Sequence, residues 1–197
     1  THETLFFRDT AMFEALRKEI LPRLLSKGSG GRKLRIWSAA ASSGQEAYSL
    51  AMLALELGKG TSDVEILGTD LSTQVLERAR EGVYGTFEIG RGISPAFLLK
   101  YFDKRGSEWQ IKEHIRRMVR FEQRDLRADV KALGKFDLVL CRNVLIYFDP
   151  ATKQSICHGL QSVLQPDGFL VLGTGEILPT SVSLRRASVS GSAFYSL

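Results

Sequence analysis

Polar side chains after apolar runs, together with one loop of small residues, mark the positions where this sequence could do chemistry. The loop is SAAASSGQEAYS at 38–49, where small side chains let a ligand approach the backbone and Gly44 permits a tight turn into a helix. It lacks the G-x-G-x-x-G spacing of a dinucleotide fingerprint, and GKGT at 58–61 lacks the spacing of a phosphate-binding P-loop. The loop is therefore typical of a nucleotide-type ligand, while NAD and ATP are disfavoured.

Four polar candidates each have a ligand-binding role and a plain structural one. Asp70 could accept hydrogen bonds from both hydroxyls of a ribose, or cap the next helix. Asp125 with Leu126 could bracket an adenine, or the carboxylate could stay solvated. Asn143 closes an apolar run and needs a ligand or the loop backbone as partner, because an unpaired buried amide costs about 1–3 kcal/mol. Glu46, at a helix start, could pair with a ligand ammonium or only stabilise the positive N-terminal end of its helix.

The hydrophobic pattern alternates between strand and helix periods, which predicts an α/β sheet with helices packed on its faces. The predicted strands are 34–38, 64–70, 118–126, 136–143 and 169–174, with two short edge strands at 184–186 and 193–197. Helices are predicted over 46–58, from Ser72 to Gly82, and from Asp149 with Pro150 at its first turn. In such sheets ligands bind beyond the carboxyl ends of the strands, which is where the four candidates come together.

The predicted set of ligand contacts contains partners for a ribose, an adenine and an amino-acid ammonium, and no phosphate-binding loop. S-adenosylmethionine has these three groups and carries no phosphate. We therefore expect S-adenosylmethionine as the cofactor. A metal site is not expected, because His2, His114 and His158 are scattered along the chain.

Two segments fall outside the predicted sheet. Residues 1–30 carry an amphipathic helix and a linker expected to contribute to the cofactor site, and residues 31–197 form the catalytic domain. Within that domain EWQI and RRMVRF predict a small β-hairpin at about 104–121. Because the chain starts at Thr1 rather than Met, we expect an excised fragment.

Composition excludes some functional classes and leaves others open. The 197 residues suffice for about one domain, and 27 basic against 22 acidic residues give a net charge of +5. Eight of the basic residues fall between Lys104 and Arg127, either as a solvated face or as a surface for an acidic partner. The sequence has no long apolar run and its start is too charged for a secretory signal, and its two cysteines lie in apolar stretches, so we expect a cytoplasmic protein without disulfides.

Five blocks of the sequence resemble, in order and spacing, the CheR-type chemotaxis receptor methyltransferases. They are THETLFFRD, RIWSAAASSGQEAYSLAM, GTDLS, CRNVLIYFD and LQPDGFLVLGTGE. The resemblance implies a class I, Rossmann-like S-adenosylmethionine-dependent methyltransferase that esterifies glutamate side chains on the cytoplasmic helical domain of chemoreceptors. It also implies that the small β-subdomain meets the receptor. By this resemblance we expect the family's amino-terminal helical domain to be absent from this chain.

The resemblance assigns roles residue by residue. It implies that the cofactor contacts are Thr4, Arg8, Glu46, Asp70, Asp125, Leu126, Asn143 and Val144. Arg8 and Tyr147 look like the family's pair at the reacting centre, and the tyrosine could instead be a core aromatic. His2 stands where the family usually has Asn, which puts one cofactor contact in doubt. Three further positions depart from the family pattern: Gln45 replaces the first of two acids, Ala47 replaces a proline, and Asp125 replaces the more usual Asn. Glu46 remains in place, and Asp125 still supplies a hydrogen-bond acceptor.

The expected reaction is transfer of a methyl group to a carboxylate that is already ionised at pH 7, so no strong general base is required. Alternatives are a cofactor-binding regulator that has lost catalysis, a methyltransferase of the same fold acting on another carboxylate, and a nucleic-acid binder suggested only by the charge. We expect a monomer that binds neither nucleic acid nor the membrane interior.

Overall fold

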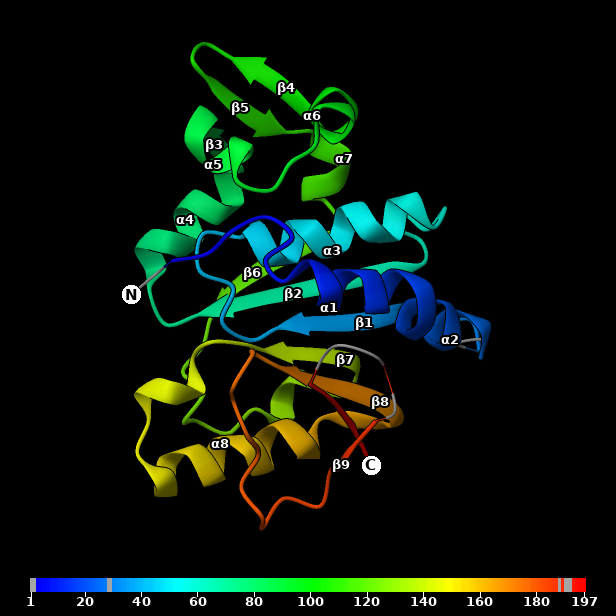
Figure 1. The fold of residues 1–197 in the computed structure, drawn as a ribbon, viewed down its shortest axis with the longest axis vertical. Helices are drawn as coiled ribbons and strands as arrows, with labels where there is room; N and C mark the ends of the chain where they lie inside the picture. Colours follow the sequence, from blue (N-terminus) through cyan, green and yellow to red (C-terminus); the bar gives the residue numbers. More distant parts are fainter. Residues whose placement is uncertain (1–2, 28–29, 188, 190–192) are drawn as a thin grey trace.

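The chain forms an open twisted sheet flanked by helices (Figure 1). The structure is a computed structural model that describes residues 3–27, 30–187, 189 and 193–197. Within these residues the main sheet contains the strands β1 (Leu34–Ser38), β2 (Val64–Asp70), β6 (Val119–Gln123), β7 (Phe136–Cys141), β8 (Leu164–Leu172), β9 (Arg185–Arg186) and β10 (Phe194–Ser196). The predicted strands at 34–38 and 64–70 have these bounds in the structure.

The strand order of the main sheet is β6-β2-β1-β7-β8-β10-β9. Strand β1 pairs in parallel with β2 on one side and with β7 on the other, and β10 runs antiparallel to β8 and β9. The α/β class and the antiparallel edge predicted from the sequence are confirmed. Because the order reverses between β1 and β7, a ligand crevice belongs at the carboxyl ends of these strands.

Helices cover both faces of the sheet because successive strand residues point to opposite sides. Ile36 belongs to one apolar core and Trp37 to the other, and Leu138 and Val139 of β7 divide in the same way. The first core is covered by α1 (Thr10–Ala15), the π-helical turn η1 (Leu16–Ile20), α2 (Leu21–Ser26), α3 (Gln45–Glu56) and α4 (Thr73–Glu81). The second core is covered by α8 (Pro150–Ser162) and the short turn η2 (Lys131–Leu133). Both central strands are thus buried on two faces, as their continuous apolar runs predict.

The amino-terminal amphipathic helix packs on the first face beside α3 (Figure 1). It runs without a break through α1, η1 and α2. Its predicted apolar stripe is buried: Met12, Phe13, Leu16, Ile20 and Leu24. The segment before it, residues 3–9, is held against the main domain by the burial of Phe6 and by the bond from Phe7 N–H to Ser49 Oγ at 2.9 Å.

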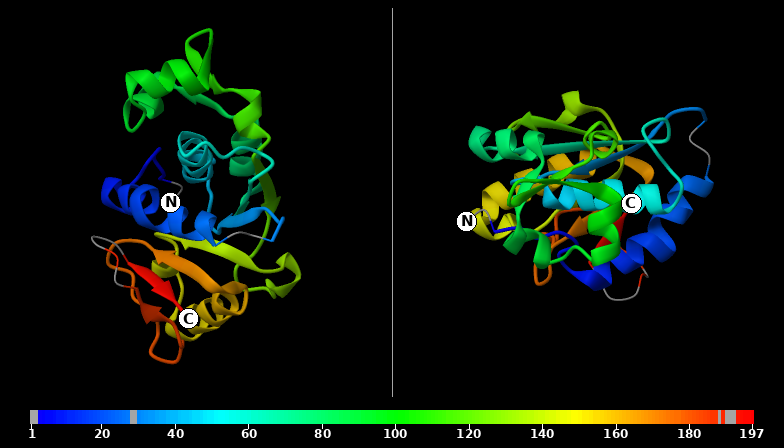
Figure 2. Two further views of the ribbon diagram at one scale, coloured as in Figure 1. Left: turned by 90° about the vertical axis from the view of Figure 1, so that its right-hand side faces the viewer. Right: turned by 90° about the horizontal axis from the view of Figure 1, so that it is seen from above.

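A second, three-stranded antiparallel sheet projects beyond the main sheet, at the top of Figure 1 and in the left view of Figure 2. This sheet belongs to a small subdomain that consists of β3 (Val83–Gly85), α5 (Thr86–Gly90), α6 (Pro95–Tyr101), β4 (Phe102–Arg105), β5 (Glu108–Ile111) and α7 (Glu113–Arg116). The subdomain differs from the predicted hairpin, because EWQI pairs with FDKR at 102–105 and with VYG at 83–85. RRMVRF instead ends α7 and enters β6 of the main sheet.

Candidate active site

A cavity of about 320 Å³ opens at the carboxyl ends of the four adjacent strands β6, β2, β1 and β7. Every residue singled out as a site candidate lines it: Thr4, Arg8, Glu46, Asp70, Asp125, Leu126, Asn143, Val144 and Tyr147. The other lining residues are Glu3, Leu5, Phe13, Ala39, Ala40, Ser42, Leu71, Arg124, Arg127, Arg142 and Phe148. The structure therefore brings the candidates together, and their individual roles stay predictions. His2 lies outside the described residues.

The loop between β1 and α3 forms the floor of the cavity. Gly44 has a φ of 99°, and a Cβ atom there would lie 3.0 Å from the Cβ of Ala79 and 3.1 Å from the hydroxyl of Tyr84. Only glycine fits both the backbone conformation and the space. The turn places Glu46 in the first turn of α3 and leaves Ala39 and Ala40 at the cavity wall, where short side chains allow close approach.

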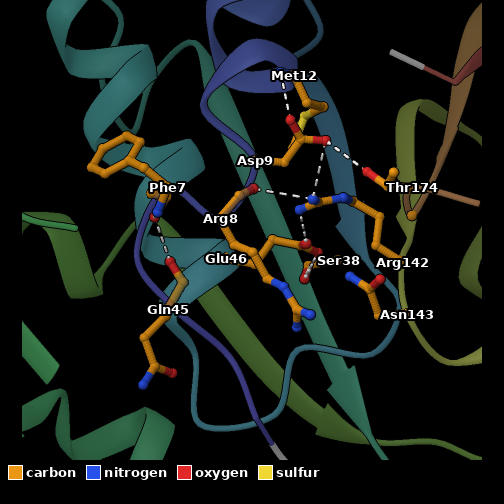
Figure 3. Close-up of polar contacts among 12 residues, drawn as sticks. Phe7, Arg8, Asp9, Met12, Ser38, Gln45, Glu46, Arg142, Asn143 and Thr174 are labelled. Carbon is orange, nitrogen blue, oxygen red and sulfur yellow. Dashed lines mark hydrogen bonds and ion pairs between the residues drawn. The ribbon is translucent and has the colours of Figure 1, made fainter. Parts of the chain in front are cut away.

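The carboxylate of Glu46 is held from two sides (Figure 3). Ser38 Oγ donates to Glu46 Oε1 at 2.8 Å, and Arg142 Nη1 donates to Glu46 Oε2 at 3.0 Å. The side chains of Arg142 and Glu46 are 3% and 12% exposed, so this ion pair is largely shielded from solvent. Among the described residues Arg142 Nε has no hydrogen-bond partner although it is buried. A charged ligand group in the cavity would therefore meet a Glu46 that is already fixed in place.

Arg142 is a site residue that the sequence predictions did not include. Besides Glu46 it binds the N-terminal strap, defined here as residues 3–9: its Nη2 donates to the carbonyl of Arg8 at 3.0 Å and lies 3.7 Å from Asp9 Oδ2 (Figure 3). The sequence signal was an arginine directly after the buried run FDLVLC, a position where a charge must find partners. One buried guanidinium thus connects the strap to the first turn of α3.

Four non-glycine residues around the cavity have left-handed backbone conformations. They are Phe7, Asp9, Ser42 and Asn143, with φ values of 51°, 72°, 50° and 58°. Ser42 and Asn143 line the cavity, and Phe7 and Asp9 flank Arg8. Such conformations cost about 1–3 kcal/mol each and gather at binding and catalytic sites. Their concentration here, within the described part of the chain, supports a functional role for the cavity.

Asp70 closes β2 with its carboxylate at the cavity wall. Its Oδ2 accepts from the backbone N–H of Ser42 at 2.9 Å and its Oδ1 from that of Ser72 at 3.0 Å. The cap of α4 is the hydroxyl of Ser72, which accepts from Val75 N, so Asp70 does not cap this helix with its own side chain. Among the bonds between described residues, each carboxylate oxygen accepts one, which leaves a lone pair that could accept from a ribose hydroxyl.

Asp125 lies at the end of β6 and is bound by Arg127. The backbone N–H and the Nη2 of Arg127 donate to Asp125 at 2.9 and 2.8 Å. These bonds hold the pKa of the Asp125 carboxyl below its usual range. The group is therefore an ionised acceptor, which suits the amino group of an adenine, and Leu126 beside it offers an apolar contact.

Tyr147 is 58% exposed and lines the cavity from the short turn η3 (Leu145–Tyr147). The alternative that it is a core aromatic is wrong, because Leu145 and not Tyr147 fills the core at this turn. Its side chain is thus accessible at the cavity.

No group of three or more His, Cys, Asp or Glu side chains in the described ranges is placed to hold a metal ion. Over those ranges no helix has both the length and the apolar character needed to cross a bilayer.

Comparison with known proteins identifies the family. Residues 2–193 match the family model described as "CheR methyltransferase, SAM binding domain". The chain is 48% identical to Chemotaxis protein methyltransferase 1 of Pseudomonas aeruginosa and 43% identical to Chemotaxis protein methyltransferase Cher2 of Pseudomonas putida. Each alignment covers 90% of this chain, which spans about two thirds (67% and 66%) of those proteins.

A solved structure supports the fold alone. The crystal structure of a TehB-like SAM-dependent methyltransferase from Corynebacterium glutamicum superposes with a TM-score of 0.50 at 18% identity, covering 88% of this chain and 82% of that one. The class I methyltransferase fold predicted from the resemblance is thereby confirmed. Since the family model covers nearly the whole sequence and both relatives are well above 30% identical, this chain belongs to the CheR methyltransferase family, of which it contains the SAM-binding domain.

Proposed function

We propose that this chain methylates glutamate side-chain carboxylates of chemoreceptors, giving glutamate methyl esters in chemotaxis adaptation. The observation that carries the proposal is the convergence, in one cavity, of all the residues that the family resemblance assigns to cofactor and reacting centre. Family membership supports the reaction class, and the convergence of these residues supports the cavity as its site.

S-adenosylmethionine is the cofactor of the matched domain, and the residues of the cavity fit it. Asp70 has free acceptor lone pairs for the ribose hydroxyls, and Glu46 is an anchored carboxylate for the methionine ammonium. Asp125, ionised by its bonds to Arg127, is an acceptor for the adenine amino group. The apolar walls at Leu126 and Val144 suit the face of the base.

When bound, this cofactor supplies a methyl group on a sulfonium and leaves as S-adenosylhomocysteine. The acceptor, a glutamate with an ordinary pKa near 4.3, needs no proton removed at pH 7, so the protein has to orient it and exclude water. Arg8 offers a planar fork of donors for a carboxylate, of the substrate or of the cofactor. Tyr147 presents its hydroxyl at the same cavity and would donate near the reacting centre.

The partner and the cellular setting follow as further parts of the proposal. The acceptor is the cytoplasmic helical domain of a chemoreceptor, reached by a monomer in the cytoplasm. The basic segment between Lys104 and Arg127 runs from β4 and β5 of the small sheet through α7 and β6, and its positive charge suits an acidic helical substrate. The names of the chemotaxis relatives support a receptor substrate.

The test is transfer of a labelled methyl group from S-adenosylmethionine to a chemoreceptor fragment. We expect label on the receptor that is released as methanol by mild base, because a methyl ester hydrolyses easily. A receptor with its methylated glutamates replaced by glutamine is the control and should take up no label. Label that resists base would contradict a carboxylate acceptor.

A further inference from the structure

Glu176, in the loop after β8, holds the turn that carries part of the active site, although it does not line the cavity. It is 5% exposed and its carboxylate accepts four backbone N–H groups. Oε2 accepts from Asn143 and Gly173, both at 2.8 Å. Oε1 accepts from Val144 at 3.1 Å and Leu145 at 3.0 Å. All four carboxylate lone-pair positions are thereby used within the chain.

The turn needs such an anchor because its backbone is strained. Asn143 has a φ of 58°, which turns three successive amides toward one point and forms a concave anion site. The protein fills this site with its own carboxylate instead of a ligand. Gly173 lets the two loops close, since a Cβ there would lie 2.6 Å from Asn143 Oδ1 and 2.8 Å from Glu176 Oε2.

The turn positions three cavity-lining residues at once. Asn143 and Val144 belong to it, and Tyr147 follows one short helical turn later, with its N–H bonded to the carbonyl of Val144 at 3.2 Å. Moving the carboxylate would therefore move both a proposed cofactor contact and the proposed reacting-centre hydroxyl. We propose that Glu176 is a positioning residue for methyl transfer, acting through this turn; the inference rests on the proposed function of Tyr147.

The test compares Glu176→Gln with Asp137→Asn in the full-length natural protein. Asp137 is a matched control, because it is also 5% exposed and its carboxylate binds Arg32 at 2.8 Å and the N–H of Arg35 at 2.9 Å, at the other end of β7. Both variants should lower the Tm. At equal folded fraction, E176Q should lower kcat by about 10- to 100-fold, since a displacement of about 1 Å in a positioned group costs roughly 100-fold. D137N should keep kcat within about twofold.

A double-mutant cycle with Tyr147→Phe separates positioning from general loss of stability. If Glu176 acts through the tyrosine, E176Q should cost much less kcat in the Y147F background than in the wild type. If E176Q does not fold, Gly173→Ala carries the same comparison, because it disturbs this turn from the other loop. Equal kcat for E176Q and D137N, or additive effects with Y147F, would overturn the inference. A wild-type protein that transfers no base-labile methyl group would refute the proposed function instead.

Discussion

Replacing Asp70 by alanine tests the cofactor site most directly. In the structure its carboxylate accepts two backbone N–H bonds, from Ser42 at 2.9 Å and Ser72 at 3.0 Å, and has lone pairs left for a ribose. Loss of the two backbone bonds, at about 1 kcal/mol each, should lower the free energy of unfolding by about 2 kcal/mol. For a domain of this size that corresponds to a fall in Tm of roughly 4–8 °C.

Cofactor affinity should fall separately from stability. Charge-assisted hydrogen bonds to the ribose would contribute about 1–3 kcal/mol, which corresponds to roughly 5- to 150-fold in the Kd for S-adenosylhomocysteine. Titration calorimetry on the folded variant measures this directly. Asp149→Ala is the control, since its carboxylate caps α8 by accepting from Thr152 N at 2.8 Å and does not line the cavity. It should lower the Tm by roughly 2–4 °C and leave the Kd unchanged. An unchanged Kd in Asp70→Ala would remove this carboxylate from the cofactor site.

Three further outcomes are expected. Tyr147→Phe should leave the Tm within about 1 °C of the wild type because the side chain is 58% exposed. The same variant should lower kcat at least about tenfold in the methylation assay, and an unchanged kcat would exclude the hydroxyl from the mechanism. Arg127 lowers the pKa of Asp125. The Asp125 carboxylate is therefore fully ionised above the ordinary pKa of an aspartate, and it is protonated only when the pH falls through its own lowered pKa. The ratio of cofactor affinities of wild type and Asp125→Asn should therefore be constant from pH 5 to 8 by calorimetry, and a changing ratio would contradict this. Burial raises the pKa of Cys157 to about 11 and that of Cys141 well above its usual value. A thiol reagent at pH 8 should therefore label neither cysteine in the native protein, and both cysteines once guanidinium has unfolded it. Rapid labelling of the native protein would contradict this and would show that the core opens.

The central strands could be predicted from the sequence because local pattern and tertiary environment agree there. The run LRIWS is β1 and VEILGTD is β2, each apolar on the positions that face the two cores. The small sheet could not be predicted in the same way. Val83 pairs with Gln110, so β3 joins β5 by contacts distant in the sequence, and the short strand VYG carries no alternating pattern. The assignment of RRMVRF to the hairpin is wrong, while the predicted strand at 118–126, which shares MVRF, is confirmed as β6, because alternation alone does not say which sheet a strand joins.

The candidate ligand contacts were easier to predict than the residues that hold them. Asp70 and Asn143 follow apolar strands, so their position in an α/β sheet follows from strand order alone. Glu176 also follows an apolar strand, but its partners are backbone amides of a turn near residue 143, and no side-chain pattern indicates them. The left-handed backbone conformation of Phe7 and Asp9 could not be predicted from the sequence either, since neither residue type requires it.

Arg142 makes the cavity a connected unit. Through Glu46 it reaches the proposed ammonium contact, and through the carbonyl of Arg8 it reaches the segment that carries the proposed reacting-centre guanidinium. Removing it would leave a shielded carboxylate without its cation and would remove one bond to the N-terminal strap, which the bond from Phe7 N–H to Ser49 Oγ also holds. Effects of substitutions at these three residues should therefore not add, because residues that share one hydrogen-bond network are energetically coupled. Cofactor affinity and turnover have to be measured together in any variant of this network, since a change in one contact alters the geometry of the others.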